Sequence, residues 1–421
     1  MINKSKFSID ALFNLFSVGI SGILYILINT IIIHYYGEDV LGVFNQSYAV
    51  YIIIAQIAAF GIHLSVQQYT PRFFNDKEKI NDSVTSALIL VFLIATIVTL
   101  SCYPFTGMVA TFFDSENVNQ GLYYCLWGIV FFSLNKVLLA FINGVRKMKS
   151  FALFTFLRFF LMFVTLCYLI FFYDDSSLIT IIFAIPELIL FLILIGYSSS
   201  LFSLKLSSSS LSFIKEHFNF GRSAFVGNLL LDINTRVDVI MLGYFTTDQN
   251  VGIYSFVLAI AEGILQIPVV FRNNINPIIT KASVMKNVSE QLNLLLKKNI
   301  VSFYKIIGGI ALLTIALYPL GLFILGINEH FMTYWILYAI LVFAIALASG
   351  YLPLTMIFNQ MKLPHIQSLF FLILFVINVI GNFIFIQWIG IYGAAIGTAL
   401  SYVAQLLFIK IFAHKYCHLR I

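Results

Sequence analysis

The sequence predicts an all-α integral membrane protein of about twelve transmembrane helices in two six-helix bundles. Hydrophobic residues make up 61% of the 421 residues and charged residues only 10%, whereas soluble proteins carry about 25% charged residues. The apolar runs are continuous rather than alternating, which favours helices over a membrane β-barrel. At roughly 20 apolar residues per helix, the chain has room for about twelve spans and for no folded domain outside the bilayer.

The apolar runs place the expected spans one by one. The first run is too long for the apolar part of a signal peptide, and no small-x-small cleavage site follows it, so we expect a retained span. The twelve spans are expected at residues 11–33, 43–66, 84–104, 121–142, 151–173, 177–197, 218–243, 251–279, 301–325, 333–357, 365–388 and 392–413.

Basic residues set the orientation, because Lys and Arg are retained on the cytoplasmic side. They occur at alternate connections, and the intervening connections hold acidic residues instead. Twelve spans fit this alternation with both termini in the cytoplasm. The net charge of +6 therefore indicates topology, and no nucleic-acid partner is expected. The basic connections contain Lys4, Lys6, Arg72, Lys77, Lys79, Arg146, Lys147, Lys149, Lys205, Lys215, Lys281, Lys286, Lys297, Lys298, Lys362, Lys410, Lys415 and Arg420.

A serine-rich stretch divides the chain near its midpoint, as a flexible linker would. We expect an N-terminal bundle at 1–197, a cytoplasmic linker at 198–217 and a C-terminal bundle at 218–421. A weak internal repeat supports two halves, since residues 38–44 (EDVLGVF) align with residues 248–254 (DQNVGIY). An even number of spans per half makes the halves parallel repeats about the membrane normal.

Several ionisable residues fall inside the expected spans, where each costs on the order of 2.5–3.5 kcal/mol, so such residues usually face a cavity. In the seventh span, Arg222, Asp232 and Arg236 lie within roughly an 80° sector at 100° per residue. This stripe suits a water-filled cleft rather than lipid. The embedded residues are His63, Lys136, Arg158, Glu187, Arg222, Asp232, Arg236 and Glu262.

These residues form two functional groups. The four cations, Lys136, Arg158, Arg222 and Arg236, match an anion too large for one side chain, such as a diphosphate. The remaining four, Asp232, Glu187, Glu262 and His63, are assigned to ion coupling or charge balance. Structural alternatives stay open for six of these eight residues, all except Lys136 and Arg158. Arg222 could extend to the membrane interface, and Asp232 could pair with Arg236 to join two helices. The two glutamates could neutralise cations, and His63 could be a polar group of the core.

The sequence offers no enzyme site. It contains no metal-ligand cluster, nucleophile triad, phosphate-binding glycine loop or nucleotide fold, and its four cysteines form no CxxC pair. We therefore predict a transporter without cofactor or metal, driven by an H+ or Na+ gradient if it is coupled to one.

Three segments resemble one family. They are Arg236-Val237-Asp238 through Pro268, Asn382 through Ser401 with its Ile389-Gly390-Ile391-Tyr392-Gly393 run, and Tyr36-Gly37 through Pro71-Arg72. The sequence resembles the polysaccharide exporters of the multidrug/oligosaccharidyl-lipid/polysaccharide (MOP) superfamily, specifically the O-antigen (Wzx-type) flippases. The resemblance implies a V-shaped, MATE-like fold in the bacterial inner membrane. It also implies translocation of an undecaprenyl-diphosphate-linked oligosaccharide to the periplasmic leaflet, next to a polysaccharide polymerase and a chain-length regulator.

Three rival functions remain. A multidrug antiporter shares the architecture, but its cationic cargo would prefer an acidic cleft. A lipid II flippase carries similar chemistry, and the cations alone do not separate it. A polysaccharide polymerase is disfavoured because the expected outer connections are short and acidic.

Overall fold

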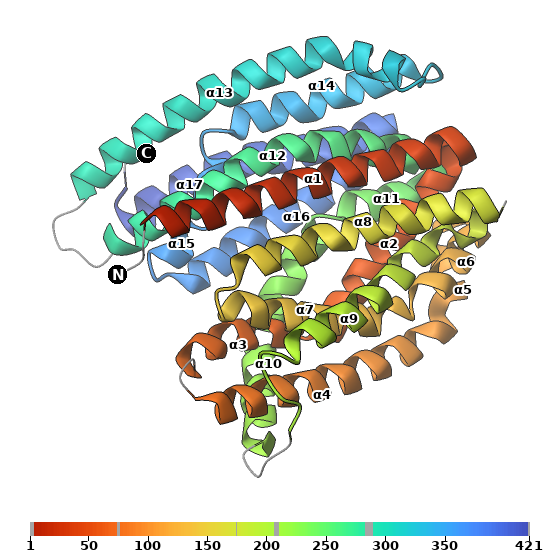
Figure 1. Ribbon diagram of the computed structural model, residues 1–421. Helices are drawn as coiled ribbons and strands as arrows, with labels where there is room; N and C mark the ends of the chain where they lie inside the picture. The colour runs from red at the N-terminus through yellow and green to blue at the C-terminus, as the bar shows by residue number, and fades with distance from the viewer. Residues whose placement is uncertain (1–3, 74–75, 174, 206–209, 283–288, 420–421) are drawn as a thin grey trace. The chain divides into compact units, whose positions relative to one another are not determined.

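A computed structural model describes residues 4–73, 76–173, 175–205, 210–282 and 289–419 (Figure 1). Every regular element within these ranges is helical. Ten of the described helices are long and apolar enough to cross a membrane, and an eleventh span is formed if the pair α6–α7, bent by 48°, crosses as one. The prediction of an all-α, multi-pass membrane protein is confirmed. The count of about twelve is not reached among these residues.

The seventh expected span accounts for the difference. The expectation of one continuous helix at 218–243 is wrong, because α10 (Ser210–Asn234) ends before α11 (Val237–Phe245) begins. Four of the five residues from Asp232 to Arg236 are polar, and Asn and Thr are weak helix formers whose side chains compete for backbone hydrogen bonds. The chain therefore breaks where its apolar pattern is interrupted.

The chain forms two compact units. The first unit comprises residues 1–36 and 43–233, and the second comprises residues 37–42 and 234–421. The helices centred in the first unit are α1 (Lys4–Tyr36), α2 (Glu38–Ala59, whose first turn belongs to the second unit), α3 (Ile62–Tyr69), α4 (Lys77–Cys102), α5 (Thr106–Phe113), α6 (Glu116–Cys125), α7 (Gly128–Gly144), α8 (Met148–Phe172), α9 (Ile185–Ser198) and α10. Those of the second unit are α11, α12 (Asp248–Ala282), α13 (Ser289–Ile324), α14 (Phe331–Ala348), α15 (Ile357–Gln360), α16 (Pro364–Ile389) and α17 (Ile391–Cys417).

This grouping differs from the expected bundles at 1–197 and 218–421, because α10 packs with the first unit. The imidazole of His217 is fully buried and hydrogen-bonds Ser65 on α3 through Nδ1 and Ser83 on α4 through Nε2. Ser86 of α4 donates to the carbonyl oxygen of Ser210 at 3.0 Å. These contacts fasten the start of α10 to the N-terminal helices. The centre of the expected linker, residues 206–209, lies outside the described residues.

The core of the first unit lies between α3, α4, α7 and α9. Leu138 and Phe141 of α7 are fully buried there against Val84 of α4 and Leu190 of α9. In Figure 1 the long helices α1 and α8 run alongside each other. Burial of such apolar side chains is worth about 1.5–3 kcal/mol each relative to water, although lipid removes much of that driving force between spans.

The second unit is built around α16 and α17, which lie side by side (Figure 1). Their backbones approach closely because small residues line the contact. A Cβ added to Gly393 would overlap the carbonyl oxygen of Phe385, and one added to Gly397 would overlap the side chain of Asn382. Small residues permit such close approach between membrane helices, where van der Waals packing drives association.

The internal repeat appears in the structure as a reciprocal contact. A Cβ added to Gly42 would overlap the carbonyl oxygen of Asp248, and a Cβ added to Gly252 would overlap that of Glu38. These are the positions that align in the repeat, since residue 38 matches 248 and residue 42 matches 252. The first turns of α2 and α12 therefore meet backbone to backbone through equivalent glycines.

The outer surface is suited to lipid and the helix ends to water. Phe171, Leu312 and Trp388 expose 81%, 75% and 75% of their surface, which is unfavourable in water and ordinary in a bilayer. At the beginning of α4, Asp76 accepts a hydrogen bond from the backbone N–H of Lys79. This bond, with the Lys79 ammonium 3.2 Å away, holds the pKa of the Asp76 carboxyl below its usual value.

Candidate functional site

The first unit places two of the predicted cations against one aromatic ring. Phe132 and Lys136 lie four residues apart on α7, and Arg158 comes from α8. Lys136 Nζ is 5.0 Å and Arg158 Cζ is 4.9 Å from the centroid of the Phe132 ring. A cation within about 6 Å of an aromatic face is attracted by the ring quadrupole. The buried ring of Phe132 thus lowers the cost of holding two positive charges close together.

A buried carboxylate balances one of these cations. Glu187, near the N-terminus of α9, has Oε1 2.6 Å from Arg158 Nε, and Arg158 Nη2 donates to Oε2 at 3.2 Å. Asn135 Nδ2 donates to Oε2 and to the Glu187 backbone carbonyl, each at 2.8 Å. The side chains of Arg158 and Glu187 are 16% and 5% exposed. This geometry agrees with the charge-balancing alternative for Glu187.

Lys136 has a different environment. Its ammonium donates to Oε1 of Gln56, on α2, at 2.6 Å. Asp232 of α10 and Glu187 lie within electrostatic range of it, as does Arg158. With two cations and two carboxylates, this group of charges has no formal net charge. We name Lys136, Arg158, Glu187 and Asp232, with Phe132, the N-cluster.

His63 and Arg222 lie differently from these residues. His63 belongs to α3, beyond the left-handed turn at Phe60 and Gly61 that ends α2. It is within electrostatic range of Lys136, and its buried Nδ1 has no hydrogen-bond partner among the described residues. Arg222 is an exposed side chain on α10. This exposure agrees with the interfacial alternative for Arg222.

The predicted stripe of Arg222, Asp232 and Arg236 on the seventh span is not formed, because the helix is interrupted between α10 and α11. Arg236 is not helical but occupies the N-cap position of α11, with φ −130° and ψ −4°. The angular relation to Asp232, which assumed one continuous helix, therefore does not apply. Arg236 instead belongs to the second unit, where it lies within electrostatic range of Asp238 and Glu262.

The second unit contains a buried carboxylate, Asp238, that is not among the site residues predicted from the sequence. Asp238 of α11 accepts hydrogen bonds from Tyr254 Oη at 2.6 Å, Thr398 Oγ1 at 3.3 Å and its neighbour Val239 N at 2.9 Å. Tyr254 comes from α12 and Thr398 from α17, so three helices meet at this carboxylate. We name Asp238, Tyr254 and Thr398 the C-network. Glu262, predicted from the sequence, lies within electrostatic range of Asp238.

The sequence contained signals for the residues that were missed. Asp238 stands in the apolar run Val237-Asp238-Val239-Ile240, so the criterion that singled out Glu262 applies equally to it. Phe132 and Asn135 share the helix with Lys136, and Phe132 lies four residues away on its face. Gln56 had no such signal, because its partner is distant in the sequence.

Removing the Asp238 carboxylate should destabilise the second unit. Asp238→Ala removes the acceptor shared by the Tyr254 hydroxyl, the Thr398 hydroxyl and the Val239 N–H. The two hydroxyls, 3.0 Å apart, can then bond only each other, so one hydroxyl proton and the Val239 N–H lose their acceptor, and a buried unsatisfied group costs about 1–3 kcal/mol. We expect a clear fall in the melting temperature of the purified protein, and a smaller fall for Asp238→Asn, which keeps one oxygen acceptor. An unchanged melting temperature in Asp238→Ala would contradict the structural importance of this network.

Chemically, both groups of residues bind and balance charge rather than cleave bonds. Among the described residues, no three His, Cys, Asp or Glu side chains gather closely enough to hold a metal ion. In the N-cluster, a cation such as Arg158 can exchange its carboxylate partner for another anion. Such an exchange suits the movement of a charged group through an apolar protein interior.

Comparisons with known proteins identify the class of the fold. The chain superposes with a TM-score of 0.80 on an inward-facing multidrug resistance MATE family transporter of the MOP superfamily, at 14% identity over 95% of this chain and 97% of that one. The lipid II flippase MurJ, in an inward closed conformation, gives a TM-score of 0.76 at 17% identity over 96% and 87%. An outward-facing MATE transporter gives 0.65 at 15% identity over 97% and 94%. The chain therefore shares its fold with these MATE transporters and with MurJ.

The family follows from the sequence itself. Residues 9–284 match the family model described as polysaccharide biosynthesis protein. The chain therefore belongs to the polysaccharide biosynthesis protein family, and the solved structures that it resembles are those of transporters and of a flippase. No sequence among the curated proteins matches the chain.

Proposed function

We propose that the protein is a flippase that moves undecaprenyl-diphosphate-linked oligosaccharide repeat units, of an O-antigen or a related polysaccharide, from the cytoplasmic to the periplasmic leaflet of the bacterial inner membrane. The observation that carries the proposal is the N-cluster within a family of polysaccharide biosynthesis proteins. Two cations held beside one buried ring offer a site for a diphosphate, and the apolar outer surface lets the lipid tail stay in the bilayer.

The charge balance of the N-cluster suggests how binding proceeds. Lys136 donates its short hydrogen bond to a neutral amide, so a phosphate oxygen can replace Gln56 without breaking an ion pair. Arg158 must exchange the Glu187 carboxylate for the substrate, and Asn135 continues to donate to that carboxylate. The empty site is charge-balanced, and a bound diphosphate diester adds two negative charges that uptake of H+ or Na+ at Glu187 and Asp232 offsets, which lowers the cost of transfer through a low-dielectric region.

Alternating access completes the proposal. The cluster is exposed first to the cytoplasm and then to the periplasm, with no covalent step. Binding of H+ or Na+ at Glu187, Asp232 or Glu262, with His63 as a further proton acceptor, biases the two states. The exporter would act beside a polymerase and a chain-length regulator, with both of its termini in the cytoplasm.

A deletion strain tests the function directly. We expect loss of surface polymer with lipid-linked repeat units trapped on the cytoplasmic face of the membrane. Unpolymerised repeat units already facing the periplasm would point to a polymerase, and normal surface polymer would exclude the flippase. Complementation with the wild-type gene serves as the control.

Neutralising Lys136 should impair export more than stability. Lys136→Gln removes a cation whose direct hydrogen-bond partner, Gln56, is neutral, and the glutamine amide can still donate to that partner. We expect surface polymer to fall at least tenfold, with near-normal amounts of folded protein in the membrane. Lys77→Gln, which removes the same charge from an exposed position at the start of α4, is the matched control. Full polymer in Lys136→Gln would exclude Lys136 from substrate binding.

A multidrug antiporter is the second candidate. Two observations favour it: the N-cluster is balanced rather than net basic, and the second unit holds the buried carboxylate Asp238 with the half-buried Glu262 within electrostatic range of it. Carboxylates in an apolar environment suit cationic cargo. Increased sensitivity of the deletion strain to cationic drugs, with normal surface polymer, would establish this function instead.

A further inference from the structure

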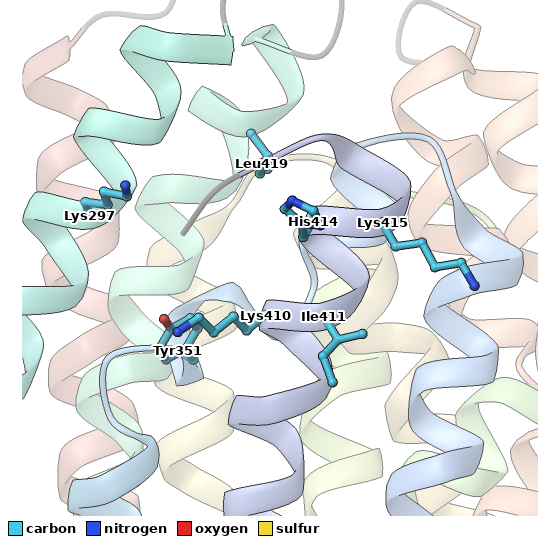
Figure 2. Close-up of a pocket in the computed structure, with 7 residues that line it drawn as sticks. All are labelled: Lys297, Tyr351, Lys410, Ile411, His414, Lys415 and Leu419. Carbon is cyan, nitrogen blue, oxygen red and sulfur yellow. The ribbon is translucent and has the colours of Figure 1, made fainter.

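A basic hollow opens in the second unit, and its lining residues belong to neither the N-cluster nor the C-network. It has a volume of about 920 Å³ and lies between α13 and the C-terminal part of α17 (Figure 2). Figure 2 shows Lys297 extending from α13 and Lys410 extending from α17 into the intervening space, whereas Lys415 extends away from it. The lining residues are Lys297, Tyr351, Lys410, Ile411, His414, Lys415 and Leu419.

The charge of this hollow points to an anionic ligand. Three of its seven lining residues are lysines, and none of the seven is acidic. Lys297 and Lys410, which extend into the hollow, repel one another, and an anion between them removes that repulsion. The ammonium groups, together with the Tyr351 hydroxyl and His414 ring, supply hydrogen-bond donors for phosphate oxygens.

The position of the lysines points to a lipid rather than a free ion. Lys297 lies about two turns into α13, and Lys410 lies about two turns before the end of α17, which places each about 10–12 Å from its helix terminus. Both helices are apolar enough to span a membrane. Lysines at this depth lie near the level of lipid headgroups.

Apolar side chains adjoin the lysines on the lipid-facing surface. Val301 follows Lys297 by one turn on α13 and is 52% exposed. On α17, Leu407 and Ile411 flank Lys410 and are 49% and 54% exposed. A cationic hollow bordered by exposed apolar side chains matches a molecule that has a phosphate headgroup and acyl chains.

We propose that this hollow binds the phosphate headgroup of an anionic phospholipid. Its lysines place this end of the second unit at the cytoplasmic leaflet, because Lys and Arg are retained on the cytoplasmic side. Basic pockets between membrane helices on this side are a physical match for such headgroups. The ammonium groups act as point charges that recognise phosphate without selecting a sugar. The site shares no residue with the N-cluster and does not depend on the cargo.

Lipid binding to the purified full-length protein tests this proposal. We would measure the affinity of the protein in neutral detergent for fluorescently labelled phosphatidylglycerol and cardiolipin, with phosphatidylcholine of the same acyl chains as the reference lipid. We expect the anionic lipids to bind more tightly, and Lys297→Gln/Lys410→Gln to lose at least tenfold in affinity for them. Lys298→Gln removes an adjacent, exposed charge that does not line the hollow, and it should bind as the wild type does.

Competition separates the possible sources of phosphate. Wild-type affinity in the double variant, or equal binding of phosphatidylcholine, would overturn the proposal. Displacement of the lipid by millimolar inorganic phosphate alone would assign the hollow to a free anion. Preferential binding of undecaprenyl diphosphate that requires Lys297 and Lys410 would assign it to a polyprenyl carrier instead. Because the assay reads lipid binding and not export, its result is independent of the flippase test.

Discussion

Arg158→Gln is expected to abolish most surface polymer and to lower the melting temperature of the protein, whereas Arg158→Gln/Glu187→Gln is expected to regain the melting temperature and not the polymer. The single variant leaves the Glu187 carboxylate, which is 5% exposed, without its ion pair. Breaking a buried pair by removing one partner costs about 3–5 kcal/mol, whereas neutralising both partners is often nearly neutral. The double variant therefore separates a structural role of Arg158 from a role in binding substrate.

The two readouts are thermal unfolding in detergent and polymer on complemented deletion cells. Glu187→Gln alone is the companion variant, since it keeps the guanidinium and the amide contact to Asn135. Polymer at the wild-type level in the double variant would show that the pair only supports the fold. Equal melting temperatures for the single variant and the wild type would contradict the buried ion pair.

Gly252→Ala and Gly42→Ala are expected to be the most destabilising small substitutions in the chain. At each glycine, the added methyl group would overlap a backbone carbonyl oxygen, which cannot move aside as a flexible side chain can. Overpacking of this kind costs typically about 1–3 kcal/mol and occasionally more. We expect a strong fall in the melting temperature and in the amount of protein in the membrane.

Gly263→Ala is the matched control for these substitutions. Gly263 lies on the same helix as Gly252, and an added Cβ would have nothing within 4 Å. Alanine is favoured over glycine within a helix by about 1 kcal/mol, so this variant should be neutral or more stable. Because Gly42 and Gly252 share one contact, the double variant should lose less than the sum of the two single losses. Strict additivity would argue against the shared contact.

The membrane fold was predictable because it depends on properties that the sequence carries locally. Eleven of the expected spans overlap a helix or bent pair that is long and apolar enough to cross a bilayer. The exception, residues 218–243, contains polar residues from Asp232 to Arg236, and hydropathy averaged over the whole segment conceals the helix break. The residues before and after such a break no longer share a helical register.

The sequence could identify several charged residues of the candidate site, but it could not show which of them contact one another. Lys136, Arg158 and Glu187 were identified because each interrupts an apolar run, and each is found in one group of contacts. Periodicity along one helix says nothing about which residue of another helix lies opposite. Gln56, on α2, and the shared ring of Phe132 were therefore beyond the sequence, and the charge balance of the N-cluster depends on tertiary packing.

The reciprocal contact of Gly42 and Gly252 also bears on the origin of the chain. Gly42 lies against residue 248, and Gly252 lies against residue 38. Since residues 42 and 252 are aligned in the repeat, as are residues 38 and 248, each half contributes the same two positions to the contact. Reciprocity of this kind is the property of an isologous interface, in which two identical subunits meet about a two-fold axis. A half-length ancestor could have formed the same contact with a second copy of itself. Fusion of two such copies then frees each half to diverge, as the charge-balanced N-cluster and the acidic C-network have done.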